Sequence, residues 1–251
     1  MEFTEILPYI IVCPLVFLAG FIDAIAGGGG LISLPAYLLA GLPPHMAIGT
    51  NKLSSAIGTT VATAQYASKG YMLWKMALPT CILSLLGSWV GSNLTLLVPE
   101  RVFMIVMLIA LPLIAIYVLT HKTLARDTEA EITTRTWGVA LASAFGIGMY
   151  DGFYGPGTGT FLMLLLTGMA HLTLRQAAGI TKVINLSSNI LALYVFLSNG
   201  TVLLPLGLSA AVFGMAGNYL GARSFIQKGE AIARPVIITV LAILMIKILF
   251  F

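Results

Sequence analysis

Charge is scarce in this sequence. Only 9% of its 251 residues are Asp, Glu, Lys or Arg, whereas roughly a quarter of an ordinary soluble domain is charged. Hydrophobic residues make up 59%, and apolar runs of about 20 residues, the length of a helix that crosses a bilayer, fill most of the chain. These features exclude a soluble enzyme, a disordered chain and an aqueous catalytic domain, so any function must lie within the membrane.

Other common functional signatures are also missing. The two cysteines, Cys13 and Cys81, lie in separate apolar segments without metal-ligand spacing, and none of the three histidines has a partner at helical spacing. The glycine-rich runs are not followed by Lys and Ser or Thr, as in a nucleotide-binding loop. We therefore expect no metal, no cofactor and no catalytic residues. The net charge of +4 comes from basic residues at segment ends, where membrane topology uses them, and does not indicate a nucleic-acid partner.

Glycines and charged residues recur along the chain at two nearly constant offsets. At an offset of 128 residues, Asp23 and Gly27, Gly28, Gly29 and Gly30 recur as Asp151 and Gly155, Pro156, Gly157, Thr158 and Gly159. At an offset of 130 residues, Gly49, Asn51 and Lys52 recur as Gly179, Thr181 and Lys182. Matches of this kind arise by chance less readily than matching leucines. The sequence therefore predicts two homologous halves, 1–120 and 136–251, joined by a linker at 121–135.

Each half is expected to contain five membrane segments, of which the second is short. The segments of the first half are 8–26, 30–42, 44–68, 71–97 and 101–120, and those of the second are 136–153, 157–169, 173–198, 201–222 and 233–251. At 1.5 Å per residue, the short segments reach roughly 20 Å and cannot cross a hydrocarbon core of about 30 Å. We expect an all-α polytopic membrane protein whose repeats each include a short, glycine-interrupted half-span.

Basic residues are distributed oppositely over equivalent loops of the two halves. Lys69 and Lys75 flank a loop of the first half, whereas the matching loop around Asn199 has no basic residue. The next loop reverses this bias, with one basic residue in the first half and three in the second: Arg101 against Arg223, Lys228 and Arg234. The positive-inside rule then predicts inverted repeats, a cytoplasmic linker and both termini outside. Four helices per half would make the repeats parallel and leave this bias unexplained.

Four ionisable residues lie well inside apolar segments: Asp23, Lys52, Asp151 and Lys182. Lys52 follows Pro44 by eight residues, which is roughly 12 Å along a helix and close to the bilayer centre. A lysine there costs about 2.5 to 3.5 kcal/mol, so it is paired or functional. A purely structural alternative pairs Asp23 with Lys52 and Asp151 with Lys182. We favour a functional role, because structural ion bridges would not need the accompanying glycines.

The glycine runs are expected to begin half-helices that bind an anion. Without a Cβ the backbone can approach a ligand closely, and the first turn of a helix offers free N–H groups and a positive dipole end. Close helix packing is the alternative for glycines, and it suits Gly87 with Gly91 and Gly217 with Gly221 better than a run of four. The predicted anion-binding residues are Lys52, Lys182, Thr50, Asn51, Thr181, Asn185, Gly27, Gly28, Gly29, Gly30, Gly155, Gly157, Thr158 and Gly159.

The two aspartates need a different role, because a carboxylate facing an anion is unfavourable. Asp23 and Asp151 could hold the lysines, or they could carry a proton, since burial favours the neutral acid. A sodium site built from aspartate and unwound backbone carbonyls is equally compatible with the sequence. The coupling ion therefore stays open at this point.

The residues just described resemble the sulfite exporter TauE/SafE family, a group of small bacterial and archaeal permeases. The resemblance extends over the whole chain and includes Gly20 to Leu34 (GFIDAIAGGGGLISL), Gly49 to Lys52 (GTNK), Tyr154 to Thr160 and Gly179 to Lys182 (GITK). It implies transport of a small sulfur-containing or carboxylate anion, such as sulfite, a sulfonate or thiosulfate, in either direction. The halves differ where Pro156 and Thr158 replace glycines and Thr181 replaces Asn51, so the two half-sites are expected to be unequal.

Inverted repeats with short, glycine-interrupted segments are typical of secondary transporters, whose substrate binds near the midplane. We therefore expect an alternating-access transporter that binds its anion between Lys52, Lys182 and the half-helix starts. The alternative is an anion channel in which the same lysines line an open path. An intramembrane enzyme or assembly factor would not need either lysine for flux. The apolar exterior suits lipid and a homodimer alike, which leaves the oligomeric state open.

Overall fold

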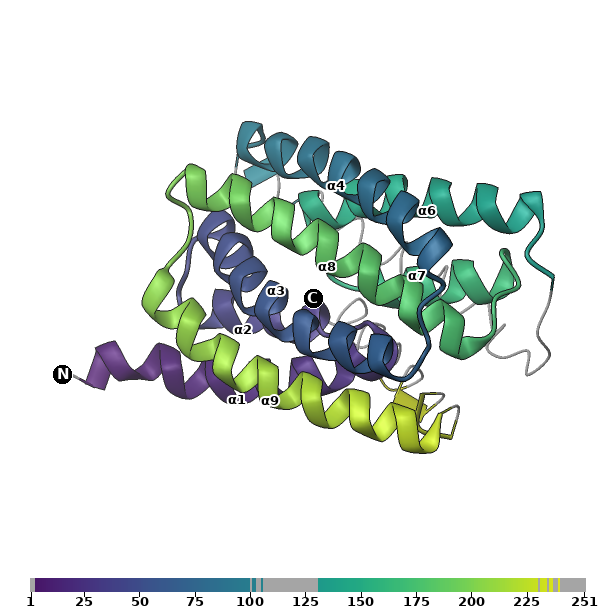
Figure 1. Cartoon of the computed structure of the whole chain (residues 1–251). Coiled ribbons are helices and arrows are strands. Elements are labelled where there is room, and N and C mark those ends of the chain that lie inside the picture. Colours follow the sequence, from purple (N-terminus) through teal and green to yellow (C-terminus); the bar gives the residue numbers. More distant parts are fainter. Residues whose placement is uncertain are drawn as a thin grey trace.

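The architecture comes from a computed structural model that describes residues 3–99 and 131–229, together with 101, 102, 105, 231–233, 235, 236 and 239 (Figure 1). Within these ranges all regular secondary structure is helical and no strand occurs. Most of the predicted segments 101–120 and 233–251, and most of the linker at 121–135, lie outside the described residues. The expectation of an all-α protein is confirmed for the described residues.

The described helices of each half follow the same order of lengths, which is long, short, long and long. They are α1 (Phe3–Ala26), α2 (Gly30–Leu39), α3 (Pro44–Ser68), α4 (Trp74–Leu97), α6 (Thr134–Phe153), α7 (Thr158–Gly168), α8 (Leu174–Ser198) and α9 (Leu204–Lys228). The short helices α2 and α7 have 10 and 11 residues, or about 15 to 17 Å at 1.5 Å per residue, too little to cross a bilayer. The helices lie close to where the sequence places its segments. The largest differences are that α1 begins at Phe3, before the expected start at 8, and that α9 runs on to Lys228, past the expected end at 222.

Several helices have the length and composition of membrane spans. Ile6–Ala26, Trp74–Leu97 and Leu174–Ser198 are each long and apolar enough to cross a bilayer, and α2 and α7 are apolar but short. Large apolar side chains also cover the exterior, as the exposed fractions of Leu78 (68%) and Val212 (60%) illustrate. A soluble protein would bury such side chains, so the molecule is a multi-pass membrane protein.

The two halves of the chain interlock through their outer helices. α1 packs along α9 and α4 packs along α6, so that the first helix of each half lies against the fourth helix of the other (Figure 1). Gly217 and Gly221 on α9 face the backbone of α1, and Gly87 and Gly91 on α4 face the backbone of α6. A Cβ at any of these glycines would overlap the neighbouring helix. This is the close packing that small residues four apart permit.

α3 and α8 form the centre of the bundle and run in opposite directions. Lys52 near the start of α3 contacts Asn189 in the second half of α8. Thr63, later in α3, lies 3.5 Å from the carbonyl of Lys182, which is earlier in α8. α3 also packs on α9, and α8 on α4. These two helices therefore bring the buried lysines of both halves into the middle of the molecule.

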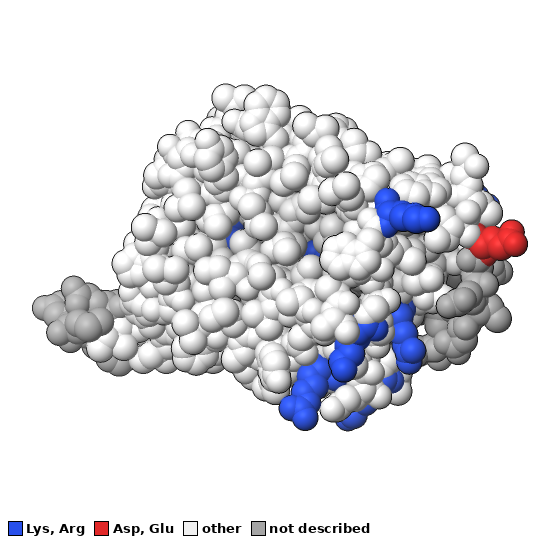
Figure 2. Space-filling model, in the orientation of Figure 1, with Lys and Arg blue, Asp and Glu red and all other residues white. Residues whose placement is uncertain are grey.

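The exposed basic side chains gather at one end of the bundle. Figure 2 shows the blue Lys and Arg atoms at the end where α3 passes to α4 and α9 terminates in Figure 1. Contacts link these segments: the guanidinium of Arg175 lies 5.8 Å from the ring centre of Tyr71, and Tyr71 packs against Phe225 of α9. The basic residues on α9 itself, Arg223 and Lys228, are exposed. On the face shown in Figure 2 the visible basic side chains are thus concentrated at this end, although the exposed Arg101 follows the opposite end of α4.

The close contact between α4 and α6 predicts a stability effect. Replacing Gly91 by Ala would place a Cβ onto the backbone of Met149, and such overpacking costs about 1 to 3 kcal/mol. We expect Gly91→Ala to lower the apparent melting temperature in detergent. Gly138 in α6 has open space around its Cα, so the control Gly138→Ala should be neutral or stabilising. Equal melting temperatures for the two variants would contradict the packing.

Candidate functional site

The two glycine-rich breaks meet inside the protein. Gly27, between α1 and α2, packs directly on Gly159 at the start of α7, and Gly30 packs on Pro156. Gly27 has a φ of +73°, and Gly155 a φ of +99°, a region that L side chains rarely adopt. A Cβ at Gly27 would also overlap the backbone of Gly159. Glycine is therefore required both by the backbone conformation and by the contact between the breaks.

Both short helices present their N-termini at this meeting point. α2 begins at Gly30, as the sequence predicts, and α7 begins at Thr158, one residue after the expected start of its segment at 157. Gly29 and Gly157 occupy the N-cap positions, and no side chain caps either helix. The first N–H groups of a helix have no intrahelical acceptor and carry the positive end of its dipole. Two such ends in one place favour an anion.

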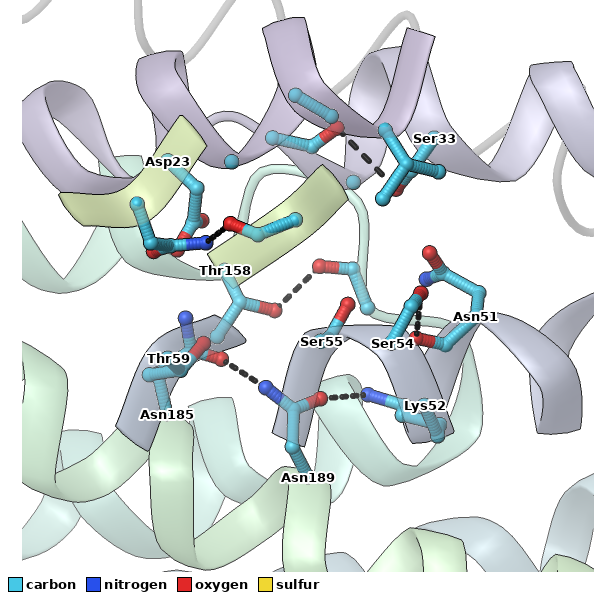
Figure 3. Close-up of a pocket in the computed structure, with 18 of the residues that line it drawn as sticks. Asp23, Ser33, Asn51, Lys52, Ser54, Ser55, Thr59, Thr158, Asn185 and Asn189 are labelled. Carbon is cyan, nitrogen blue, oxygen red and sulfur yellow. Dashed lines mark hydrogen bonds between the residues drawn. The ribbon is translucent and has the colours of Figure 1, made fainter. Parts of the chain in front are cut away.

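A polar cavity lies beside the two helix starts (Figure 3). It has about 520 Å³ of space that atoms do not fill, part of it open to solvent. Ten of the predicted site residues line it: Asp23, Gly27, Gly29, Gly30, Asn51, Lys52, Asp151, Gly155, Thr158 and Asn185. The sequence therefore identified much of one cavity from residues that are far apart in the chain.

The buried charges pair across the two halves. Lys52 Nζ lies 3.0 Å from Asp151 Oδ2 and donates to Asn189 Oδ1 at 3.0 Å. Lys182 Nζ lies 2.7 Å from Asp23 Oδ2 and donates to the Asp23 carbonyl at 2.6 Å. The alternative pairing within each half, Asp23 with Lys52 and Asp151 with Lys182, is wrong. Because α3 and α8 run antiparallel at the centre, each lysine reaches the glycine break of the opposite half.

The remaining predicted residues lie outside the cavity lining. Lys182 is 2% exposed and is held by Asp23, so the two ammonium groups do not line the cavity together as the sequence suggests. Thr50 accepts a hydrogen bond from the Leu203 N–H at 2.9 Å, and Thr181 is buried with no partner for its hydroxyl among the described residues. Three predicted glycines complete the set outside the lining: Gly28, Gly157 and Gly159.

Several lining residues were missed in the sequence. Asn189 Nδ2 donates to Asn185 Oδ1 at 2.9 Å, one turn earlier on α8, and this amide pair extends the Lys52 contact along the cavity (Figure 3). The other missed polar residues are Ser33, Ser54, Ser55, Thr59 and Asn218. A helical spacing of four from Asn51 through Ser55 to Thr59, and from Asn185 to Asn189, would have indicated Ser55, Thr59 and Asn189.

Two amide side chains of the cavity lack a complete set of partners. Asn51 and Asn218 both line the cavity and are 6% and 4% exposed. The Oδ1 atom of each is buried without a hydrogen-bond partner in the described part of the chain. Unsatisfied buried polar atoms are costly in a finished core, and they are found where a ligand completes the contacts. The cavity thus has the chemistry of a binding site.

Comparison with known proteins identifies the family. A model of the sulfite exporter TauE/SafE family matches residues 12–248. This chain belongs to the sulfite exporter TauE/SafE family. The resemblance noted in the sequence is thereby confirmed.

Curated relatives agree with this assignment. A probable membrane transporter protein of Sinorhizobium sp is 38% identical over 93% of this chain and 89% of its own length. One from Haemophilus influenzae is 35% identical over 88% and 87%. A third, from Escherichia coli, is 32% identical over 93% and 86%. No solved structure matches the chain. The family and these relatives are membrane transporters, not enzymes.

The Lys52 to Asp151 pair predicts a characteristic pattern of stabilities. Both side chains are nearly inaccessible, with 2% and 3% exposed, and removing one partner of a buried pair costs about 3 to 5 kcal/mol. We expect Lys52→Met and Asp151→Leu each to lower the apparent melting temperature strongly, and the double variant to lose less than the sum. The exposed Lys75 provides the control, Lys75→Met, which should change stability by less than about 0.5 kcal/mol. Additive losses would show that the two groups do not pair.

Proposed function

We propose that the protein is a secondary transporter that moves a small sulfur-containing or carboxylate anion, of the sulfite, sulfonate or thiosulfate class, across the inner membrane. The observation that carries this proposal is the meeting of two uncapped helix starts in a polar cavity beside Lys52. Backbone N–H groups, an ammonium and amides are the donors that an oxyanion requires. The transporter names of the relatives support the same class of function.

In this proposal the anion binds to the N–H groups of Gly29, Gly30 and the start of α7. Lys52 and the amides of Asn51 and Asn185 supply further donors at the cavity wall. Lys182 does not contact the anion directly in this proposal, and its positive charge acts through its ion pair with Asp23. The two half-sites are accordingly unequal, in line with the replacements of glycine and asparagine between the halves.

Alternating access is supported by the way the halves are arranged. α3 and α8 are antiparallel, and the packing of α1 on α9 has its counterpart in that of α4 on α6, as two inverted repeats would require. Because these outer pairs join helices of different halves, we propose that the pairs α1–α9 and α4–α6 move as the rigid units. The basic end of the bundle faces the cytoplasm in this arrangement, and the start of α1 lies at the opposite end.

Ligand-induced thermal stabilisation tests the anion site. We expect at least one member of a panel of sulfite, thiosulfate, taurine, sulfoacetate, sulfate and small carboxylates to raise the melting temperature of the purified protein, since a ligand at 100 times its Kd stabilises by about 2.7 kcal/mol. Lys52→Ala should lose this shift relative to its own unliganded melting temperature. Lys75→Ala, at an exposed position outside the cavity, should keep it. An unchanged shift in Lys52→Ala would refute the site.

Flux in proteoliposomes separates a transporter from a channel. The same anion should enter with saturable kinetics and exchange against internal anion by counterflow. Flux that rises linearly with concentration and shows no counterflow would instead identify an open anion path.

A further inference from the structure

The two buried ion pairs are related by the repeat, yet their aspartates are held differently. Asp151 has donors beside both of its oxygens. The Thr158 hydroxyl lies 2.8 Å from Oδ1 and also 2.6 Å from the Gly155 carbonyl, and Oδ2 lies 3.0 Å from the Lys52 ammonium and accepts from the Ser188 hydroxyl. The Asp151 side chain is 3% exposed. Two hydroxyls and one ammonium, from three helices, thus surround this carboxylate.

Asp23 has none of these hydroxyl contacts. Its Oδ2 accepts from Lys182 at 2.7 Å, and no donor to Oδ1 occurs among the described residues. The side chain is 15% exposed and lines the cavity. The repeat explains the difference, because the offset of 128 residues places Gly30 where the second half has Thr158, and the offset of 130 places Gly58 where it has Ser188. Both hydroxyls that hold Asp151 are therefore missing around Asp23.

The fixed charges at the site sum to zero. Lys52 and Asp151, which both line the cavity, form one neutral pair. Asp23, which also lines it, forms the second neutral pair with Lys182. An anion that enters adds an uncompensated negative charge where little water can screen it, which is strongly unfavourable. A positive charge that is taken up together with the anion offsets this cost.

The surroundings of Asp23 show where that charge can be taken up. Lys182 reaches it from α8, and Lys52 and Tyr66 of α3 are close enough to interact with it electrostatically. The Tyr66 hydroxyl donates to the Ala24 carbonyl at 2.6 Å, and Asp151 lies in the same cavity wall. α9 contributes Gly214 and Asn218, and α2 contributes Ser33; none of these titrates. Among the residues described, Asp23 is thus the one carboxylate of the cavity lining with an oxygen that accepts no hydrogen bond.

We propose that Asp23 is the proton-coupling residue of this protein, which takes up one proton as the anion binds and releases it on the other side of the membrane. This inference rests on the proposed anion transport. A proton from water adds to the free Oδ1 of the carboxylate, and Asp23 becomes a neutral acid. The Lys182 ammonium keeps its proton and its hydrogen bond to the Asp23 carbonyl, so its charge then balances the anion. Asp151 has no such free oxygen, because a hydroxyl contacts each of its two oxygens.

The linkage between proton and anion can be measured by calorimetry in buffers of different ionisation enthalpy. Thiosulfate, sulfate and methanesulfonate are suitable probes because their charges do not change near neutral pH. We expect wild-type protein to take up about one proton when it binds the preferred probe, and its Kd to rise about tenfold per pH unit where Asp23 is ionised. Asp23→Asn should bind the probe with a Kd that does not depend on pH, whereas Asp23→Glu should restore the dependence. Glu131→Gln, at an exposed carboxylate outside the cavity, is the control and should behave as wild type.

Transport gives a second, independent readout. In proteoliposomes a pH gradient should drive accumulation of the probe by wild-type protein, while Asp23→Asn should retain anion exchange and lose the response to the gradient. Anion binding by wild-type protein without proton uptake, or with a requirement for sodium in its place, would overturn the proposal. So would full pH dependence in Asp23→Asn. If Asp23→Asn does not fold, the proposal is decided by proton uptake on anion binding, measured in the wild-type protein and in Asp23→Glu. If no probe binds or crosses with the wild-type protein, the proposed function itself fails.

Discussion

Compensation of buried charge is the constraint on which the rest of this structure depends. Two lysines lie at the centre of a protein whose exterior is apolar, and each is neutralised by an aspartate from the other half of the chain. These cross pairs fix α3 and α8 against the ends of α6 and α1, which in turn places both glycine breaks at the middle of the molecule. The cavity lies where the two glycine breaks and the two lysine–aspartate pairs come together.

Small residues allow this arrangement to close. The glycines of α4 and α9 let the outer helices approach α6 and α1 to backbone distance, and those of the breaks let the two short helices begin against each other. Serines assist on one side of the bundle: Ser84 and Ser88 of α4 donate to carbonyls of α8 at 2.7 Å. Gly214 and Asn218 stand at the equivalent positions of α9. The polar cavity is consequently displaced toward α1, α3 and α9, and the molecule departs from strict two-fold symmetry at its centre.

Much of the fold could be predicted from the sequence because membrane helices leave a strong local signal. Apolar length placed α1 to α4 and α6 to α9, and the high cost of charge in lipid singled out Asp23, Lys52, Asp151 and Lys182. Partner choice was not predictable, since it depends on how α3 crosses α8 and not on spacing within either half. The position of Lys182 outside the cavity lining follows from that crossing. Asn189 and Asn218 were missed because the prediction rested on the cost of placing a charge in lipid, and a neutral amide in an apolar helix has no such cost.

The direct contact between Gly27 and Gly159 has a mechanical consequence. No side chain separates the two breaks, so the start of α2 has no compliant layer between itself and the start of α7. A tilt of either short helix about its first residue must displace the other. The starts of the two short helices are therefore coupled through direct backbone contact.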